Sequence, residues 1–334
     1  MKEKIHIIVP FISLNDYVLE CIENILQLNY NNFKLILLPD DQISLPNSLK
    51  DKPIKVVVTG KKTIAAKRNL GLKTFPDADY FAFIDSDAYP HKDWLRNALP
   101  HFHHNSAIWA VGGPNITPPG EPSRKRVVGN ASKSILISGT YRFRKRIAKS
   151  RFCNNLPTCN LIVSREALAA LSGFNENLIT GEDIDLCSRI IQKNKKIFYA
   201  KEVIVYHHNR ALLTPFVKQR LTWGLSVFKV MNENPSFSNV FLFVPAFFIL
   251  SLLIISAAAF FNRFFLFTLV FILSIYLVGI ILETIRWSEK IVEIPGTFIA
   301  LLTGNLAPGV GSIWAIFRLK KDDLVLARKI YRNF

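Results

Sequence analysis

The strongest constraint on this chain is a pair of long apolar runs, free of charge, in its C-terminal third. The first run reads VFLFVPAFFILSLLIISAAAFF, and the second, after an Asn-Arg pair, reads FFLFTLVFILSIYLVGIIL. Each run is close to the ~20 apolar residues that cross a bilayer as an α-helix. We therefore predict a transmembrane hairpin over residues 240–282, with helices at about 240–261 and 264–282.

A third apolar stretch, at about 294–317, contains residues that weaken a straight spanning helix. These residues are Gly304, Asn305, Pro308, Gly309 and Gly311. The tail at 318–334 is basic, and the positive-inside tendency places it in the cytoplasm. Three full crossings would leave that tail outside. The third stretch is therefore expected to span or to be re-entrant, and the charge of the tail favours a re-entrant or interfacial placement.

We expect no export signal in the N-terminal part, because the apolar stretch in MKEKIHIIVP is too short for a signal-peptide core. We expect residues 1–234 to form a cytoplasmic domain, which makes the protein an integral component of the cell membrane with its catalytic part on the cytoplasmic side. The cysteines show no zinc or CxxC spacing, so they are expected to be reduced and structural. They are Cys21, Cys153, Cys159 and Cys187.

The formal net charge is +17, and it is concentrated between residues 124 and 151, where no acidic residue occurs. The basic residues of this run are Arg124, Lys125, Arg126, Lys133, Arg142, Arg144, Lys145, Arg146, Lys149 and Arg151. Such a field attracts polyanions, including nucleic acid, anionic lipid headgroups and phosphorylated substrates. The membrane hairpin favours lipid and lipid-phosphate partners, and nucleic acid would leave the hairpin unexplained.

The first part of the chain alternates between two periodicities. Short apolar runs at 5–10, 34–39, 54–60, 80–85 and 107–113 have the length of buried strands, and stretches between them, such as 16–28 and 63–73, are compatible with helices. This alternation predicts an α/β fold with a mostly parallel sheet covered by helices on both faces. Ligands of such sheets bind beyond the carboxyl ends of the strands.

Four acidic residues fall at those carboxyl ends: Asp40, Asp41, Asp85 and Asp87. Asp85 and Asp87 form a D-x-D tripeptide directly after an apolar strand, although such a tripeptide alone is common on surfaces. Two carboxylates at a strand end can share a hard divalent cation, either Mg²⁺ or Mn²⁺, and the cation can neutralise a diphosphate.

A second acidic cluster, GEDIDL, begins a predicted helix with Glu182, Asp183 and Asp185. Any one of these acids could serve as a helix cap or complement the helix dipole. Three acids in four residues exceed what a cap needs. One of them can therefore act as a general base toward an acceptor hydroxyl.

The order of these motifs resembles the family 2 glycosyltransferases, which are inverting enzymes of the GT-A fold. The resemblance covers most of residues 5–225. The segments that carry it are VPFISLNDYVLECIENILQLNYNNFKLILLPDD, AAKRNLGL, FIDSDAYP, LSGFNENL, GEDIDL and VYHH. The resemblance implies a nucleotide-diphosphate sugar as donor, with a UDP-sugar favoured, and a divalent cation as cofactor.

The resemblance also implies roles for individual residues on the donor side. Pro10 and Phe11 begin the nucleotide pocket, and Asp40 matches the acid that contacts the base. Lys67 and Arg68 lie where the family holds the donor's phosphates or nucleoside.

Further roles follow for the acids and histidines. Asp85 matches the acid that contacts ribose or sugar and can join the metal site, and Asp87 matches the metal ligand. Asp183 matches the catalytic base with Glu182 beside it, whereas Asp185 is assigned to orientation or capping near the acceptor. One of His207 and His208 can complete the metal shell or contact phosphate; alternatively, the pair forms a packed polar turn.

The segment KQRLTWG resembles the Q-x-x-R-W signature of processive members, which binds the end of the growing glycan. Gln219 and Trp223 match it, but Thr222 stands where the arginine should be. The alternative is an amphipathic interfacial helix at about 212–232. Its lipid-facing residues would be Leu212, Phe216, Leu221, Trp223 and Phe228.

The sequence therefore predicts a metal-dependent, single-displacement glycosyltransferase of the hexosyltransferase class. Its acceptor would be a hydroxyl of a lipid-linked saccharide whose pyrophosphate lies among Arg142, Arg144 and Arg146. The alternatives are a polyprenyl-phosphate glycosyl synthase and a processive polysaccharide synthase. A nicotinamide dehydrogenase is disfavoured because no G-x-G-x-x-G follows the first strand.

Overall fold

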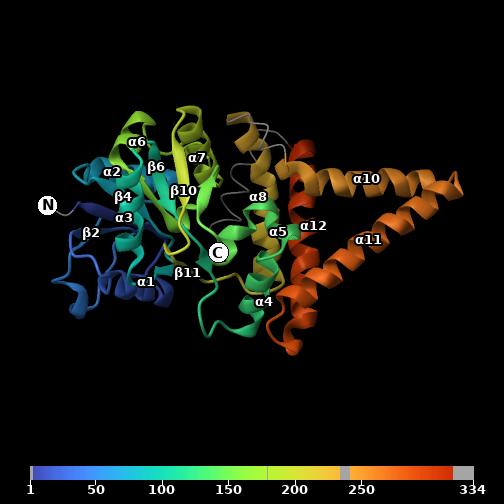
Figure 1. Ribbon diagram of the computed structural model, residues 1–334, viewed down its shortest axis with the longest axis horizontal. Helices are drawn as coiled ribbons and strands as arrows, with labels where there is room; N and C mark the ends of the chain where they lie inside the picture. Colours follow the sequence, from blue (N-terminus) through green and yellow to red (C-terminus); the bar gives the residue numbers. More distant parts are fainter. Residues whose placement is uncertain (1–2, 179, 234–240, 319–334) are drawn as a thin grey trace. The chain divides into compact units, whose positions relative to one another are not determined.

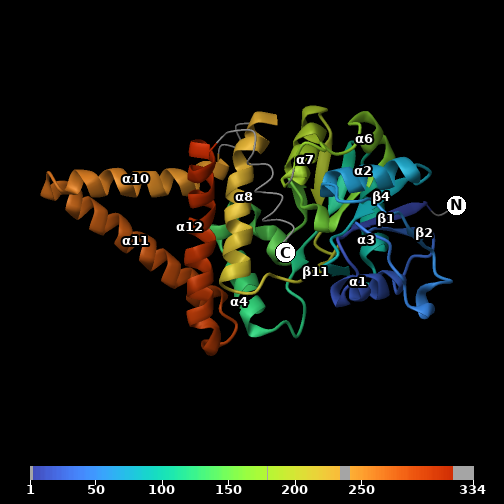
Figure 2. The same ribbon diagram turned by 180° about the vertical axis from the view of Figure 1, so that it is seen from behind.

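The computed structural model describes residues 3–178, 180–233 and 241–318 (Figures 1 and 2). The chain forms two compact units. The first, here called the polar unit, comprises Met1–Pro118 and Phe143–His208. The second, the apolar unit, comprises Pro119–Arg142 and Asn209–Phe334. Residues 119–142 thus group with the C-terminal helices, whereas the domain expected from the sequence ran without a break to residue 234. Most of the basic tail lies outside the described residues.

The polar unit is built on an eight-stranded sheet with strand order β3-β2-β1-β4-β9-β6-β10-β8 among the described residues. Its strands are β1 (Ile5–Pro10), β2 (Phe33–Leu38), β3 (Ile54–Val56), β4 (Tyr80–Phe83), β6 (Ile108–Gly112), β8 (Arg151–Cys153), β9 (Leu161–Ser164) and β10 (Lys196–Tyr199). The first four run parallel, as predicted. The strand β9 inserts antiparallel between β4 and β6, so the strand expected at 107–113 does not pair directly with β4.

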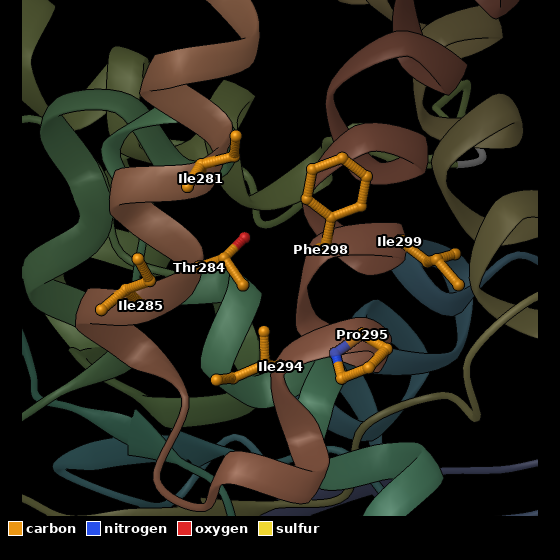
Figure 3. Close-up of a pocket in the computed structure, with 7 residues that line it drawn as sticks. All are labelled: Ile281, Thr284, Ile285, Ile294, Pro295, Phe298 and Ile299. Atoms are coloured by element: carbon orange, nitrogen blue, oxygen red, sulfur yellow. The ribbon is translucent and has the colours of Figure 1, made fainter.

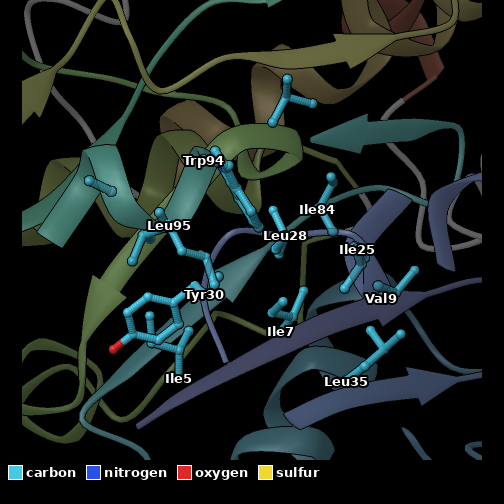
Figure 4. Close-up of a cluster of buried hydrophobic side chains, with 14 of the residues drawn as sticks. Ile5, Ile7, Val9, Ile25, Leu28, Tyr30, Leu35, Ile84, Trp94 and Leu95 are labelled. Carbon is cyan, nitrogen blue, oxygen red and sulfur yellow. The ribbon is translucent and has the colours of Figure 1, made fainter. Parts of the chain in front are cut away.

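Helices cover both faces of this sheet. On one face lie α1 (Asp16–Leu26) and α3 (Trp94–His104), and on the other lie α2 (Ile64–Thr74), α6 (Arg165–Ala170) and α7 (Glu182–Gln192) (Figure 1). Val18, Cys21, Ile22 and Ile25 of α1 recur at helical spacing and are fully buried. Ile5, Ile7 and Val9 of β1 pack with α1 and with Trp94 of α3 (Figure 4). This alternation of strand residues fixes which side of each strand faces which helix layer.

A smaller sheet forms next to the D-x-D segment. It contains β5 (Ala88–Pro90), β7 (Asn115–Ile116) and β11 (Val205–His207), in the order β5-β11-β7. β11 pairs antiparallel with β5, and His207 stands opposite Ala88. This pairing brings the end of the VYHH segment to the D-x-D, which lies more than a hundred residues earlier in the chain.

The apolar unit is helical. Its elements are α4 (Ser123–Ser132), α5 (Ile135–Ser138), α8 (Thr214–Glu233), α10 (Val244–Ala259), α11 (Arg263–Trp287) and α12 (Ile294–Arg318). By length and composition, α11 and the segment Ile291–Ile316 can each cross a membrane, whereas α10 is shorter. The mean hydropathy of α11 is high and few of its residues are buried, but half of Ile291–Ile316 is buried within the protein.

Glycine and proline do not break α12, contrary to the weakening expected from the sequence. The helix is continuous from Ile294 to Arg318, with Pro308 inside it. Its glycines permit close helix packing: a Cβ at Gly311 would overlap the carbonyl oxygen of Leu221 in α8, and one at Gly309 would overlap that of Pro245 in α10. Small residues at a helix contact allow backbones to approach closely.

Pro308 leaves one carbonyl of α12 without its usual helical partner, because proline has no N–H and the bond to residue i−4 is lost. That carbonyl belongs to Gly304. The side chain of Arg220 supplies the missing donor, with Nε 3.0 Å from the Gly304 oxygen. Its guanidinium also lies over the ring of Trp223. Arg220 therefore satisfies the backbone at the point where the proline interrupts it.

The helix expected at 212–232 is present as α8, but part of its expected lipid-facing side is buried. Leu212 and Phe216 pack against α4, α11 and α12 in a cluster with Val128, Ala131 and Leu301. Trp223 is half-buried, and the side chain of Phe228 lies outside the described residues. Tertiary packing thus uses apolar positions that the sequence alone assigned to lipid.

An apolar groove of about 460 Å³ separates the last turns of α11 from the first turns of α12. Seven residues line it: Ile281, Thr284, Ile285, Ile294, Pro295, Phe298 and Ile299 (Figure 3). The hydroxyl of Thr284 donates to the backbone of Ile280, so it adds no free donor to the groove. The groove belongs to the apolar unit and contains none of the acids identified from the sequence.

The close packing of α8 on α12 makes Gly224 sensitive to substitution. In Gly224→Ala, the added Cβ would overlap the backbone of Pro308. We expect a loss of ~1–3 kcal/mol in the free energy of unfolding, measured as a lower Tm in detergent. Gly279→Ala in α11 is the control, because nothing lies within 4 Å of that position. The control should gain up to ~1 kcal/mol from helix propensity. Equal shifts in the two variants would contradict this packing.

Candidate active site

The candidate site lies at the carboxyl ends of three neighbouring parallel strands, β2, β1 and β4. Pro10 ends β1 and Phe11 follows it; both are buried. Asp40 comes two residues after β2, and Asp85 comes two residues after β4. Because these strands run parallel in adjacent positions, their ends converge at one edge of the sheet. This is the edge at which open α/β sheets bind ligands.

Lys67 is engaged inside the protein. It lies on α2, is 3% exposed, and forms an ion pair with Asp40. Its ammonium also donates to the carbonyl oxygens of Phe11 and Leu38. The lysine therefore joins the ends of β1 and β2. A role in holding phosphate, as the resemblance implies, would require it to share these partners.

Arg68 links the two acidic clusters. It follows Lys67 on α2 and is 1% exposed. One guanidinium nitrogen donates to Glu182 Oε1 at 2.6 Å, and another donates to Asp85 Oδ1 at 3.0 Å. Burial alone would lower the pKa of Arg68, but the charges of Glu182 and Asp85 raise it, so the arginine remains charged. The D-x-D strand end and the start of α7 are thus fixed to one buried cation.

His207 faces the D-x-D acids. Its Nε2 lies 3.5 Å from Asp87 Oδ1 and 3.8 Å from Asp85 Oδ2. The pairing of β11 with β5 explains this position, since His207 stands opposite the residue that follows Asp87. The structure therefore brings together three of the four residues that the sequence assigned to the metal.

His208 points elsewhere. Its Nε2 lies 2.8 Å from Glu20 Oε2 on α1, and its ring packs on those of Tyr17 and Tyr89. Successive residues of an extended chain face opposite sides, which separates His207, the last residue of β11, from His208, which follows it. The backbone N–H of His208 donates to the carbonyl oxygen of Asp87, so this residue supports the D-x-D loop through its main chain.

The residues present fit a divalent cation of the harder kind. Carboxylates suit Mg²⁺ and Mn²⁺, and an imidazole is an accepted ligand beside them. Ligand atoms of Asp85, His207 and Cys159 lie within 4.8 Å of one another. Burial raises the pKa of the Cys159 thiol to about 12, so the thiolate that would bind a metal is disfavoured. Asp85, Asp87 and His207 are therefore the residues that would hold such a cation, with Cys159 as a neutral neighbour.

Asp183 stands one residue into α7, after Gly181, whose backbone is left-handed. Its carboxylate accepts the N–H of Ile184 at 2.8 Å. Desolvation and the neighbouring charge of Glu182 raise the pKa of Asp183 to about 6, against the opposing charges of Arg144 and Arg68. A carboxylate with this pKa is ionised at neutral pH and is a stronger base than an ordinary aspartate.

Asp185 has a structural partner. It is 3% exposed and pairs with Arg189 one turn later, at 2.6 Å from Nη2. Arg189 also donates to the carbonyl oxygens of Leu171 and Gly173. This set of contacts ties α7 to the loop after α6.

The arginines assigned to the acceptor fall in different places. Arg144 belongs to the polar unit, donates to Asn155 Oδ1 at 2.6 Å, and acts electrostatically on Asp183. The backbone carbonyl of Arg146 accepts the hydroxyl of Tyr199. Arg142 belongs to the apolar unit, as do Gln219 and Trp223, so these three are described apart from the acids.

The basic run is partly neutralised by acids that are distant in sequence. In the apolar unit, Arg126 pairs with Glu293 and Lys133 pairs with Glu289. These two pairs join α4 and its C-terminal cap to the segment before α12. Lys125 lies 3.5 Å from Glu121, which is only four residues earlier. The field that the sequence indicates at this helix is therefore weaker than the residue count implies.

Sequence reasoning missed three participants. Cys159 was dismissed, although it precedes β9 and so reaches the end of β4. Glu20 on α1 was not linked to a histidine, because its partner depends on the small sheet. Arg68 was assigned to the donor, and no sequence signal indicates that it joins both acidic clusters.

Comparison with known proteins decides the family. Residues 80–302 match the family model described as glycosyl transferase family group 2. The chain belongs to this family. The match includes the D-x-D, the α7 acids and most of the apolar helices.

Several relatives are glycosyltransferases. The pre-mycofactocin glycosyltransferase of Mycobacterium tuberculosis is 28% identical over 171 residues, which cover 51% of this chain and 35% of that protein. The chain thus spans about a third of the length of that relative. The O-antigen chain rhamnosyltransferase RfbN of Salmonella typhimurium is 26% identical over 216 residues, covering 62% of this chain and 67% of RfbN.

A solved structure shows the same fold. The mannosyltransferase PcManGT of Pyrobaculum calidifontis, in complex with GDP-Man and Mn²⁺, matches with a TM-score of 0.51 at 12% identity. The match covers 99% of this chain and 85% of that one. This likeness and the family model confirm the GT-A fold predicted from the sequence.

The buried position of Arg68 predicts a large effect on stability. Arg68→Met leaves Glu182 and Asp85 without their shared cation, and breaking a buried ion pair costs ~3–5 kcal/mol. We expect a drop in Tm of roughly 10 °C by differential scanning fluorimetry. The control is Arg165→Met, since Arg165 is largely exposed and 3.8 Å from Asp79. That change should cost no more than ~1 kcal/mol. A drop in Tm for Arg68→Met as small as that of the control would contradict the role of the guanidinium as the link between the two clusters.

Proposed function

We propose that this protein transfers a sugar from a nucleotide-diphosphate sugar to a hydroxyl of a membrane-associated, lipid-linked saccharide. The observation that carries the proposal is the joining of the D-x-D end of β4 and the acidic start of α7 by Arg68. Transfer with inversion needs a group that handles the leaving diphosphate and a base for the acceptor. The D-x-D after β4 and the acids of α7 provide these two kinds of group, and the guanidinium of Arg68 binds both segments.

The donor end is supported by the sheet edge. Pro10, Phe11 and Asp40 lie at or just beyond the carboxyl ends of β1 and β2. PcManGT, which has the same fold, was solved with GDP-Man and Mn²⁺. We assign the nucleoside to this edge of the sheet and favour a UDP-sugar. Lys67 holds Asp40 and thereby shapes the place assigned to the base.

Asp85, Asp87 and His207 would hold a divalent cation, Mg²⁺ or Mn²⁺. When bound, the cation supplies electrostatic stabilisation to the leaving diphosphate, worth several kcal/mol. Arg68 keeps Asp85 in its orientation through the 3.0 Å hydrogen bond. Asp87 is held through its backbone, because its carbonyl oxygen accepts the N–H of His208.

Asp183 is the proposed base. In a single displacement the acceptor oxygen attacks the anomeric carbon, the bond to the diphosphate breaks, and the acceptor proton moves to the carboxylate. Glu182 raises the pKa of Asp183 by its charge and is itself fixed by Arg68. General base catalysis of this kind contributes roughly 10²- to 10⁴-fold.

The membrane placement rests on the apolar unit. α11 is long and apolar enough to cross a bilayer, and its surface is mostly exposed. A lipid-linked acceptor would reach the enzyme at this surface, on the cytoplasmic side of the cell membrane. We assign its phosphate groups to Arg144 and Arg146 of the polar unit. Asp185 is excluded from the acceptor site, because it is 3% exposed and its carboxylate pairs with Arg189.

The alternative is a polyprenyl-phosphate glycosyl synthase, whose acceptor is a phosphate and needs no base. The raised pKa of Asp183 favours a hydroxyl acceptor, because a phosphate oxygen is already deprotonated at neutral pH. Processive synthesis is less favoured, since Thr222 is buried and its hydroxyl donates to the carbonyl of Lys218 in place of the signature arginine.

The metal site predicts a nucleotide effect on stability. We expect one diphosphate among UDP, GDP and dTDP to raise Tm in the presence of Mn²⁺, because ligand binding favours the folded state. The monophosphate CMP serves as a comparison. Asp87→Asn should abolish the shift. The control Asp41→Asn, at the exposed position after Asp40, should retain it. No shift with any nucleotide in the unsubstituted protein would overturn the donor assignment.

The pKa of Asp183 predicts a pH profile. Since only the ionised form accepts a proton, kcat/KM should rise as pH passes through about 6 and level off above it. Asp183→Asn should lower kcat roughly 10²- to 10⁴-fold with a hydroxyl acceptor. A phosphate product formed at an undiminished rate by this variant would favour the alternative synthase.

The raised pKa of Asp183 also means that its ionised form lowers the free energy of unfolding. A carboxyl whose pKa is raised in the folded state stabilises below its unfolded pKa, and that stability is lost as pH rises through about 6. Asp183→Asn should therefore raise Tm by a few degrees at pH 8 and by less at pH 5. A lower Tm at pH 8 would show that the carboxylate is stabilised in the fold.

A further inference from the structure

The three C-terminal apolar helices contact one another in a pattern that decides how they can lie in a bilayer. α10 and α11 form an antiparallel pair joined at the short turn that contains Asn262. Both also contact α12. Within the apolar unit, Figures 1 and 2 show α12 joining the two ends of this pair that lie away from the turn.

The start of α10 packs on the C-terminal half of α12. A Cβ at Gly309 would overlap the carbonyl of Pro245, which is the second residue of α10, and would also meet Ile249. Gly309 therefore marks the place on α12 where α10 begins.

The end of α11 faces the other part of α12. Ile281 and Ile285, in the last turns of α11, line the groove opposite Ile294 and Phe298 of α12 (Figure 3). Gly309 lies 10 to 15 residues beyond Ile294–Ile299, which corresponds to ~15–22 Å along a helix. The two ends of the hairpin therefore stand well apart on α12.

These contacts exclude a bundle of three successive crossings. In such a bundle the start of α10, the end of α11 and the start of α12 would all lie on one side of the bilayer. The start of α10 would then pack beside the start of α12. Instead it packs beside Gly309, in the half of α12 that three crossings would carry toward the opposite side.

A second observation also argues against a crossing by α12. Residues 303 and 304 are the midpoint of Ile291–Ile316, and Arg220 reaches the carbonyl of Gly304. Lys218 and Gln219 are exposed beside it on α8. If α12 crossed the bilayer, these polar side chains would stand near the hydrocarbon centre, where a charge is expensive.

The turn at the other end of the hairpin is the part best suited to deep insertion. Phe260 and Phe261 are 90% and 91% exposed. α10 has 16 residues and is ~24 Å long, which is less than the ~30 Å hydrocarbon core. α11 has 25 residues and is ~37 Å long, so it fits the same depth only when tilted.

Charged contacts mark the start of α12 as a region outside the hydrocarbon. Glu289 pairs there with Lys133, the C-cap residue of α4, and Glu293 pairs with Arg126 of α4. Ile291, between these two acids, is 87% exposed. An interfacial position satisfies both the charged pairs and the exposed apolar side chain.

We propose that the α10–α11 hairpin enters the bilayer from one side and that α12 lies along the membrane surface between the two ends of the hairpin. The lipid bilayer is thus the partner of the hairpin, and α12 does not cross it. This proposal rests on the membrane placement in the proposed function. It also keeps both ends of α12 on the side to which the basic tail was assigned.

The test compares two ends of one helix. Single cysteines are introduced as Ile291→Cys and Ile316→Cys, both at exposed positions. A membrane-impermeant maleimide is added to sealed inverted and right-side-out vesicles from expressing cells. Phe261→Cys reports the turn, and Val58→Cys, exposed in the polar unit, reports the side of that unit. The unsubstituted protein gives the background, since its cysteines are buried or half-buried.

We expect Ile291→Cys and Ile316→Cys to be labelled in the same vesicle orientation as Val58→Cys, and Phe261→Cys to resist labelling in that orientation. Labelling of Ile291→Cys and Ile316→Cys in opposite orientations would overturn the proposal and show that α12 crosses. Release of the whole chain from vesicles by alkaline carbonate would overturn the membrane placement itself. That result would leave nucleotide binding by the polar unit untouched, which separates the two failures.

Discussion

The site depends on one buried guanidinium. Burying the charge of Arg68 is costly unless its hydrogen bonds are satisfied by acids in good geometry. Asp85 and Glu182 meet that need, and each is thereby denied freedom to move. The strand end that would face the donor and the helix start that carries Asp183 consequently keep a fixed relation. An arginine suits this task better than a lysine, because its planar fork can contact two carboxylates at once.

In the apolar unit, a side chain replaces a missing backbone hydrogen bond. A proline in a helix usually produces a kink, yet α12 continues through Pro308 because Arg220 replaces the lost donor. The absence of a side chain at Gly304 leaves room for Ile137 and Phe216 to pack against the helix. Glycine and proline weaken an isolated helix, but in α12 the small residues allow neighbouring helices to pack closely.

Much of the fold could be predicted from local sequence. The apolar runs gave the four parallel strands, and the position of each acid after its run placed Asp40 and Asp85 at one edge. The antiparallel insertion of β9 could not be predicted, because strand order depends on pairing between distant segments. For the same reason the sequence left the two histidines equivalent. Burial of Leu212 and Phe216 was likewise hidden, since an apolar helix face fits lipid and protein equally well.

The alternation of β11 has one more consequence. Its register is held by the preceding loop, where the carbonyl of Val203 accepts a hydrogen bond from Asn160 and leaves no room for a Cβ at Gly113. If one residue were lost between β10 and β11, His208 would take the place of His207 beside the acids, and His207 would take the place of Tyr206 opposite Tyr89. The letters of the VYHH motif would be unchanged by that slip. Two relatives with identical motifs can therefore present different imidazoles to the same carboxylates, and only the length of the connecting loop distinguishes them.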